Sequence, residues 1–281
     1  MVSGATLISG VFGDPVEHSR SPAMHNAAYK ALGLDRAYLP FHVRPDELRN
    51  ALKAIPALGL LGVNLTLPHK ERAFKMLASV SAEGRRLGAI NCVVNRHGRL
   101  FGHNTDARGL EADLRSLKLA IARKRAVVIG AGGAAAAGVV ALTRMGVEEI
   151  VLANRTHARA LSLARWLRPI KIRATGLESL TDLETLGDAG IVLNASSAGL
   201  NDSAFPALRY EAASKDCFFY DLIYGRDPTP FLKPAIQLKR PTADGRGMLL
   251  HQGALAFELF NGLEAPLDAM RRALSRSLRL A

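Results

Sequence analysis

Residues 125–135 read RAVVIGAGGAA, and this stretch decides the fold that the rest of the sequence predicts. After Arg125, residues 126–129 form a short apolar run, which is typical of a buried strand. The next six match the dinucleotide-binding fingerprint, with alanine at the third small position. An alanine-rich helix, expected over residues 134–145, follows directly. A strand, a glycine turn and a helix in this order predict a doubly wound, Rossmann-type α/β domain.

The glycine turn also indicates what this domain binds. Glycines let the backbone come close to a pyrophosphate, and the N-terminus of the following helix offers free N–H groups and partial positive charge. The alternative is a glycine-rich turn without a ligand, but the flanking strand and helix are the context that the motif requires. We expect the pyrophosphate at Gly130, Ala131, Gly132, Gly133 and Ala134.

A second stretch, residues 149–156 (EIVLANRT), indicates which dinucleotide is bound. It predicts a strand ending about twenty residues after the fingerprint, where an NAD enzyme usually carries Asp or Glu for the ribose 2′-hydroxyl. This chain carries Asn154, Arg155 and Thr156 there, with Arg159 one helical turn further on. A carboxylate would repel a 2′-phosphate, whereas a guanidinium can bind it bidentately. The sequence therefore predicts NADP, against the alternative of a surface arginine in a helix cap.

The N-terminal part contains a second loop with candidate functional side chains, residues 62–71 (GVNLTLPHKE). An apolar run over 57–61 precedes it, so the segment predicts a buried strand that runs through a loop into a helix. Pro68 fixes its own φ angle, which places Thr66 and Lys70 on a rigid turn. Taken alone, a lysine after a proline is more often a solvated surface charge. Its significance depends on which other residues meet it.

Strands and helices alternate around this loop. Residues 7–13 and 37–43 predict strands, and residues 45–55 predict a helix. A further helix is expected over 21–32, with Ser21 as its N-cap and proline at its first position. Two apolar runs, at 89–95 and 99–102, predict a hairpin. Later segments at 190–195 and 216–222 predict strands of the dinucleotide-binding sheet, and residues from 245 onward predict a helix.

Composition limits the function classes. A chain of 281 residues fits about two domains. Its two cysteines, Cys92 and Cys217, are far apart and lack metal-type spacing, so we expect neither a disulfide framework nor a metal site, and a reduced, cytoplasmic setting is the default. The first ten residues lack the pattern of a signal peptide, and no apolar run approaches the roughly eighteen residues of a membrane span. We expect a soluble protein without membrane partners.

The net charge of +12 raises the possibility of nucleic-acid binding. Most arginines are scattered, and no helix-turn-helix, zinc finger or aromatic RNA-binding motif accompanies them. We therefore expect no nucleic-acid partner and interpret the basic tail as a solvated helix. The local cluster consists of Arg271, Arg272, Arg276 and Arg279.

Taken in order, the motifs resemble those of the shikimate dehydrogenase family, and the resemblance covers nearly the whole chain. It implies reversible, NADP-dependent reduction of 3-dehydroshikimate to shikimate, a step toward chorismate and the aromatic amino acids. The residues that carry it, besides the fingerprint and residues 154–156, are 13–15, 18–22, 25–26, 64–70, 88–91, 102–106, 194–196, 221–224, 245–248 and Gln252.

The resemblance also implies residue roles. Lys70 and Asp106 would be the catalytic pair, with the lysine giving a proton as hydride reaches the C3 carbonyl. Hydroxyl and amide side chains would line the substrate, at Ser19, Ser21, Thr66, Asn91, Tyr224 and Gln252. Ser196, Leu222 and Gly245 would join the cofactor-binding residues. Cys92, Ser196 and Phe260 depart from residues common in the family, which questions fine specificity more than activity.

The implied layout is a two-domain α/β protein. A substrate-binding catalytic domain would take residues 1–106 and 242–281, with an NADP-binding Rossmann domain inserted over 107–241. The chain would act as a monomer or homodimer on a small-molecule substrate.

Three alternatives stay open. One is a quinate or dual quinate/shikimate dehydrogenase, although two serines at positions 19 and 21 resemble the shikimate-preferring form. Another is a non-catalytic NADP-binding regulator, which would not need both Lys70 and Asp106. The third is a nucleic-acid binder that uses the basic surface.

Overall fold

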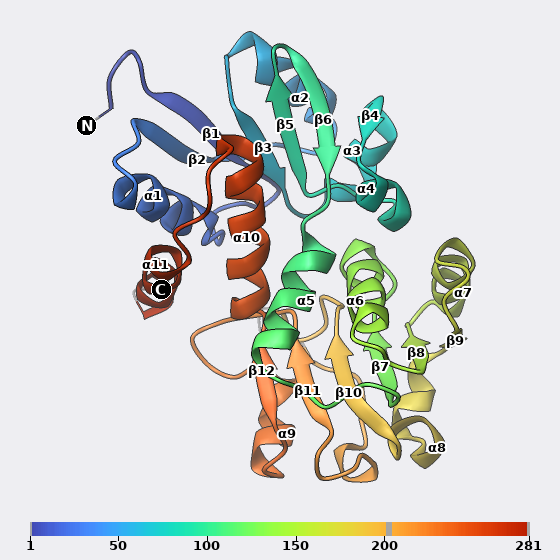
Figure 1. The fold of residues 1–281 in the computed structure, drawn as a ribbon. Coiled ribbons are helices and arrows are strands. Elements are labelled where there is room, and N and C mark those ends of the chain that lie inside the picture. The colour runs from blue at the N-terminus through green and yellow to red at the C-terminus, as the bar shows by residue number, and fades with distance from the viewer. Residues whose placement is uncertain (1, 201–203, 280–281) are drawn as a thin grey trace. The chain divides into compact units, whose positions relative to one another are not determined.

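The computed structural model describes residues 2–200 and 204–279, and the chain divides into two compact units. Unit 1 contains residues 1–109 and 249–281, and unit 2 contains residues 110–248. Each unit is built on a six-stranded sheet (Figure 1). The predicted α/β fold class, with a Rossmann-type unit inserted between two segments of another α/β unit, is confirmed.

The sheet of unit 1 has the order β2-β1-β3-β5-β6-β4. Strand β1 is parallel to both of its neighbours, and β5 and β6 form an antiparallel hairpin beside β3, as the sequence predicts. The carboxyl ends of β1, β2 and β3 therefore lie at one edge. The strands are β1 (Leu7–Gly13), β2 (Arg36–His42), β3 (Gly62–Leu65), β4 (Ser79–Val80), β5 (Cys92–Arg96) and β6 (Arg99–His103).

The helices of unit 1 present apolar faces to this sheet. In α2, Leu48, Leu52 and Ile55 recur at helical spacing, and they are buried in one core with Phe12 and Val63 of the sheet. Two helices, α5 and α10, continue across the division between the units. The helices are α1 (Ser21–Ala31), α2 (Leu48–Ala57), α3 (Lys70–Met76), α4 (Ala82–Leu87), α5 (Asp106–Ser116), α10 (Arg246–Asn261) and α11 (Leu267–Arg279).

The sheet of unit 2 is parallel throughout, in the order β12-β11-β10-β7-β8-β9. Its first strand in sequence, β7, is central, and the chain continues to β8 on one side and later to β10 on the other. In such sheets ligands bind beyond the carboxyl ends of the strands at this reversal. The strands are β7 (Arg125–Ile129), β8 (Glu149–Ala153), β9 (Ile172–Thr175), β10 (Ala189–Asn194), β11 (Phe218–Asp221) and β12 (Thr242–Asp244).

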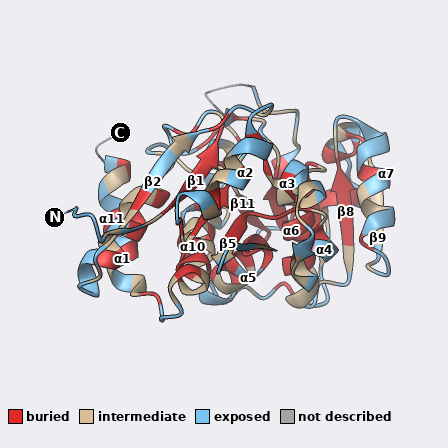
Figure 2. Cartoon of the chain, turned by 90° about the horizontal axis from the view of Figure 1, so that it is seen from above, coloured by how far each residue is buried: buried red, intermediate tan, exposed pale blue. Residues whose placement is uncertain are grey.

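Small residues bring α6 close to the sheet of unit 2. A Cβ atom at Gly138 would lie 2.5 Å from Cδ2 of Leu193, so a larger residue there would force the Leu193 side chain to shift. In Figure 2, β8 and α6 show much buried surface, whereas α7 carries exposed residues. The helices are α6 (Gly133–Arg144), α7 (His157–Trp166), η1 (Leu177–Thr181), α8 (Leu183–Leu186), η3 (Tyr210–Ala212) and α9 (Leu232–Gln237).

Two predicted helix starts were wrong by a few residues. Ser21 is the first residue of α1 and not its N-cap, which is Arg20. The first N–H groups of a helix have no partner within the helix, so Pro22 fits the second position as well as the first. The helix expected from residue 45 begins at Leu48, with Glu47 as its N-cap.

The basic C-terminal segment forms the amphipathic helix α11. Met270, Ala273, Leu274 and Leu278 are buried at helical spacing. The arginines at positions 271, 272, 276 and 279 are exposed, as expected for a solvated helix face. Within the described ranges, the longest apolar helical windows fall short of what a membrane crossing requires.

Candidate functional site

A partly buried ion pair marks the candidate site of unit 1. Lys70 is the first residue of α3, directly after the rigid loop, and Asp106 is the first residue of α5. The Lys70 Nζ atom lies 2.6 Å from Oδ2 of Asp106, whose side chain is only 4% exposed. The lysine side chain is 23% exposed, so its ammonium reaches the surface while the carboxylate does not. A charge-assisted hydrogen bond of this length is among the stronger kinds.

Asn91 engages the other oxygen of the same carboxylate. Its amide nitrogen donates to Oδ1 of Asp106 at 2.7 Å and approaches Oε1 of Gln252 at 3.2 Å. The close packing of α5 on α10 makes this possible, because a Cβ atom at Gly109 would lie 2.6 Å from the backbone nitrogen of Gln252. The structure thus brings four predicted residues, including Lys70, into one network.

The remaining predicted substrate residues of unit 1 lie after the ends of strands, Thr66 and Ser19 in loops and Ser21 at the start of α1. Thr66 follows β3, and its backbone N–H donates to the carbonyl oxygen of Phe12 at 3.0 Å. Ser19 accepts a hydrogen bond from the Ser21 backbone N–H at 3.4 Å, and Ser21 is 8% exposed. The sixth predicted substrate residue, Tyr224, belongs to unit 2 and follows β11.

Asn64, to which sequence reasoning assigned no role, supports this network through the backbone of Asn91. The Tyr38 hydroxyl donates to Oδ1 of Asn64 at 2.8 Å, and the Asn64 amide donates to the Asn91 carbonyl at 3.1 Å. Burial raises the pKa of Tyr38 well above its usual value, so its hydroxyl stays a neutral donor. The signal was an asparagine inside an otherwise apolar buried strand, because a buried amide requires partners.

His69 fixes the loop that carries Lys70. It is buried, and its Nε2 atom lies 2.7 Å from the carbonyl oxygen of Val43. A carbonyl oxygen can only accept a hydrogen bond, so Nε2 carries the proton and donates. Burial lowers the pKa of His69, which favours the neutral ring. The residue before Lys70 is therefore tied to the segment after β2.

In unit 2 the fingerprint has the expected conformation. Gly130 has φ of +117°, a region that side chains rarely adopt, and α6 begins three residues later at Gly133. A Cβ atom at Gly130 would lie 2.8 Å from the carbonyl oxygen of Ala195. Residues 131–134 are half-buried, so the N-terminus of the twelve-residue helix is accessible. This geometry suits a pyrophosphate.

The residues predicted to choose NADP lie where β8 ends and α7 begins. The Asn154 amide donates to the carbonyl oxygen of Thr156 at 2.9 Å, which shapes the turn, and Thr156 is the N-cap of α7. Arg155 and Arg159 are exposed. Because β8 is parallel to its neighbour β7, residues 154–156 follow the strand end next to the one that carries the fingerprint turn.

The other predicted cofactor residues follow the next strands of the same sheet. Ser196 follows β10, Leu222 follows β11, and Gly245 follows β12. A Cβ atom at Gly245 would lie 2.2 Å from the Leu222 carbonyl oxygen, so this position requires glycine. Asp221, the last residue of β11, is a fully buried carboxyl group. Burial raises the pKa of Asp221 to about 6.

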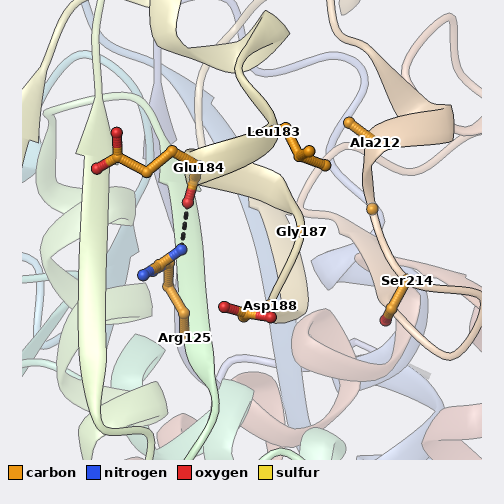
Figure 3. A pocket seen from close by; sticks show the side chains of 8 residues that line it. Arg125, Leu183, Glu184, Gly187, Asp188, Ala212 and Ser214 are labelled. Atoms are coloured by element: carbon orange, nitrogen blue, oxygen red, sulfur yellow. Dashed lines mark hydrogen bonds between the residues drawn. The ribbon is translucent and has the colours of Figure 1, made fainter.

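A pocket of about 530 Å³ opens at the opposite edge of this sheet, by the amino ends of β7 and β10 (Figure 3). Arg125 lies in it, but this guanidinium pairs with Glu149 at 2.8 Å and donates to the backbone carbonyl of Glu184. No predicted site residue lines the pocket. Ligands of doubly wound sheets bind at the carboxyl edge, so we assign the pocket no part in the site.

The described residues offer no group of three His, Cys, Asp or Glu side chains placed to hold a metal ion. Cys92 and Cys217 are both buried free thiols. Burial raises the pKa of each thiol, which disfavours the reactive thiolate.

Comparison with known families assigns most of the chain. The family described as shikimate dehydrogenase substrate binding domain matches residues 11–93. The family described as shikimate / quinate 5-dehydrogenase matches residues 113–230, and a shikimate 5′-dehydrogenase C-terminal domain matches residues 245–274.

Individual relatives agree over nearly their full length. A protein named shikimate dehydrogenase (NADP(+)), from Symbiobacterium thermophilum, is 40% identical over 96% of this chain and 94% of its own. A Thermus thermophilus shikimate 5-dehydrogenase, solved with NADP(H) and shikimate, is 39% identical with a TM-score of 0.87, covering 97% of this chain and 100% of that one. A quinate dehydrogenase from Corynebacterium glutamicum, solved with NAD, is 29% identical with a TM-score of 0.87, covering 96% and 99%.

The raised pKa of Asp221 makes a prediction about stability. Its pKa of about 6 in the fold exceeds the ordinary 3.8, so folding favours the protonated form. The stability that this group contributes is complete below about pH 4 and is lost as the pH rises through about 6. At about 1.4 kcal/mol per pH unit, the loss approaches 3 kcal/mol. The side chain in Asp221→Asn does not titrate. The free energy of unfolding of this variant, relative to that of the natural chain, should therefore rise by this amount between pH 4 and pH 7.

Urea unfolding of both proteins at pH 4, 5, 6 and 7 measures this difference, because the titration of all other groups cancels in the comparison. Two stability curves that run parallel over this range would show that the Asp221 pKa is not raised.

Proposed function

The chain belongs to the shikimate dehydrogenase family, and on this premise we propose which of its residues carry out the reaction. It is an NADP-dependent oxidoreductase that interconverts 3-dehydroshikimate and shikimate, and its relatives carry the name shikimate dehydrogenase (NADP(+)). The observation that carries the residue assignment is the Lys70–Asp106 ion pair, which lies within the network of predicted substrate residues.

Lys70 is the proton donor in the proposed mechanism. Reduced NADP, when bound, would supply the hydride that adds to the C3 carbonyl carbon. The Lys70 ammonium gives its proton to the developing alkoxide oxygen and recovers it when the reaction runs in reverse. Asp106 holds the ammonium in one direction, because its Oδ2 atom accepts from Nζ of Lys70 while its Oδ1 atom is held by the Asn91 amide.

Hydroxyl and amide groups suit the proposed substrate. Shikimate is a small ring with hydroxyls and a carboxylate, so short polar side chains can pair its polar groups. Such a site rejects analogues that lack a hydroxyl, because its own groups would stay unpaired. The side chains we propose for this role are Ser19, Ser21, Thr66, Asn91, Tyr224 and Gln252. They belong to a substrate domain of residues 1–106 and 242–281, except Tyr224.

The NADP domain is proposed to span residues 107–241. Its glycine turn binds the pyrophosphate, and Arg155 and Arg159 bind the 2′-phosphate. The exposure of both arginines supports this assignment. We further propose that the protein works in the cytoplasm, as a monomer or homodimer. Its two buried free thiols suit a reducing compartment.

Lys70→Ala should lower kcat by about a hundredfold or more, the usual contribution of general acid–base catalysis, with a smaller change in KM. Steady-state rates of shikimate oxidation measure this. Lys75→Ala, an exposed lysine on the same helix, is the matched control and should keep wild-type kinetics. Near-normal turnover by Lys70→Ala would exclude the lysine as the proton donor.

Arg155→Ala should raise the KM for NADP about ten- to a hundredfold, which corresponds to the loss of a hydrogen bond to a charged group. The KM for NAD should not change, because NAD has no 2′-phosphate. Arg165→Ala removes an exposed arginine from the last turn of the same helix α7 and serves as the control. An equal effect of Arg155→Ala on both cofactors would contradict the 2′-phosphate assignment.

The natural enzyme should prefer shikimate over quinate in kcat/KM by about tenfold or more, the discrimination that one polar group can give. Quinate carries an extra C1 hydroxyl and a puckered ring, for which the pocket at Ser19 and Ser21 would need room. Initial rates with each acid and each nicotinamide cofactor test this. Equal rates on both acids would favour the dual quinate/shikimate alternative.

A further inference from the structure

Asp221 is a buried carboxylate that the proposed mechanism does not use. It ends β11 and has no exposed surface. Its Oδ1 atom accepts hydrogen bonds from the Asn194 amide at 2.9 Å and from the Ile223 backbone N–H at 3.0 Å. Its Oδ2 atom accepts one from the Thr229 hydroxyl at 2.5 Å. These three donors are neutral, and within residues 2–200 and 204–279 no ion pair to this carboxylate is found.

The first donor connects Asp221 to the loop after β10. Asn194 is the last residue of that strand and lies opposite Asp221 in the parallel register. Its side-chain oxygen accepts from both the hydroxyl and the backbone N–H of Ser196, at 2.7 and 3.1 Å. The Asn194 side chain therefore fixes the turn that carries a proposed cofactor residue, and Asp221 fixes the Asn194 side chain.

The turn after β10 also packs against the glycine fingerprint. The Ala195 carbonyl and the Ser196 nitrogen would lie 2.8 and 3.1 Å from a Cβ atom at Gly130. Movement of the Ala195–Ser196 peptide would consequently change the surface against which the pyrophosphate turn packs. The path from the Asp221 carboxylate to Gly130 passes through Asn194 and this one peptide.

The other two donors connect Asp221 to the loop after β11. Ile223 and Thr229 lie at either end of this loop, and Thr229 also accepts a hydrogen bond from the Leu232 backbone N–H at the start of α9. Leu222, between Asp221 and Ile223, packs its carbonyl against Gly245. One carboxylate thus joins two of the loops that carry proposed cofactor residues, those after β10 and β11.

We propose that Asp221 is a positioning residue for NADP, which holds the loops after β10 and β11 in the conformation that binds the cofactor. The inference rests on the proposed function, namely on Ser196, Leu222 and Gly245 as cofactor-binding residues. A carboxylate suits this role because it offers acceptor sites on two oxygens, so it can hold three donors from two loops at once. A buried carboxyl without a cation costs stability, so fold stability alone does not explain it.

Thr229→Val tests the proposal, because valine has the shape of threonine but cannot donate to Asp221. We expect the Kd of NADP, measured by isothermal titration calorimetry, and the KM for NADP to rise about tenfold. The kcat at saturating NADP should stay within about threefold, since Lys70 and Asp106 are untouched. Thr229→Ser keeps the hydroxyl and should restore binding close to the natural value, which a loss of methyl packing would not do.

The opposite outcomes are equally specific. A folded Thr229→Val protein with unchanged NADP affinity would overturn the proposal, as would equal losses in Thr229→Val and Thr229→Ser. If Thr229→Val does not fold, Asp221→Leu, which fills the site but accepts no hydrogen bond, must show the same rise in Kd without a matching fall in kcat. An unchanged Kd in that variant would also overturn it.

The failure of this inference is distinguishable from a failure of the proposed function. If Arg155→Ala weakens NADP binding while Thr229→Val does not, the cofactor assignment stands and the positioning role falls. If Thr229→Val weakens NADP binding while Arg155→Ala does not, the positioning role stands and the 2′-phosphate assignment falls.

Discussion

The site of unit 1 depends on one constraint, that a buried carboxylate must be paired. The Asp106 side chain is 4% exposed, and leaving such a charge without partners would cost several kcal/mol. Its partners come from different parts of the chain, Lys70 at the start of α3 and Asn91 just before β5. Helix α5, the residue before β5 and the start of α3 must therefore all be in place before the carboxylate has both of these partners. The residues that carry the proposed chemistry also hold these elements together.

Unit 2 contains a buried carboxyl group with a different set of partners. The hydrogen-bond donors of Asp221 in the described part of the chain are neutral, and burial raises its pKa, whereas Asp106 lies beside an ammonium. A carboxylate paired with a movable proton donor can take part in catalysis. A carboxylate held by backbone, hydroxyl and amide groups can fix loop geometry, but none of these groups can transfer a proton to a substrate as an ammonium can. The surroundings of the two groups, and not their residue type, separate the two proposed roles.

Sequence patterns predicted the parts of the structure that depend on neighbouring residues. The strand, glycine turn and helix around Gly130 follow a fixed local spacing, and so does Arg155 at the end of the next strand. The contact between Lys70 and Asp106 joins residues 36 positions apart. No periodicity reports such a contact, and it was expected only because the motifs resemble a known family.

The residues that sequence reasoning missed are polar groups inside apolar strands. Asn64 lies in the buried strand GVNL, and Asp221 ends the buried strand FFYD. Their partners lie elsewhere in the chain, so the sequence shows that a partner is required without showing which one. The start of α1 was misplaced because its N-cap, Arg20, makes no side-chain capping hydrogen bond, so no capping residue marks the position in the sequence.

The two parts of the proposed cofactor site differ in how freely they can change during evolution. Gly130 combines a positive φ angle with close contact to Ala195, so almost any substitution would disturb the backbone. Arg155 is exposed, and surface substitutions usually change stability by less than about 0.5 kcal/mol. Descendants of this chain could therefore exchange one nicotinamide dinucleotide for the other by drift at a few surface positions. The scaffold that grips the part common to both cofactors would be inherited unchanged.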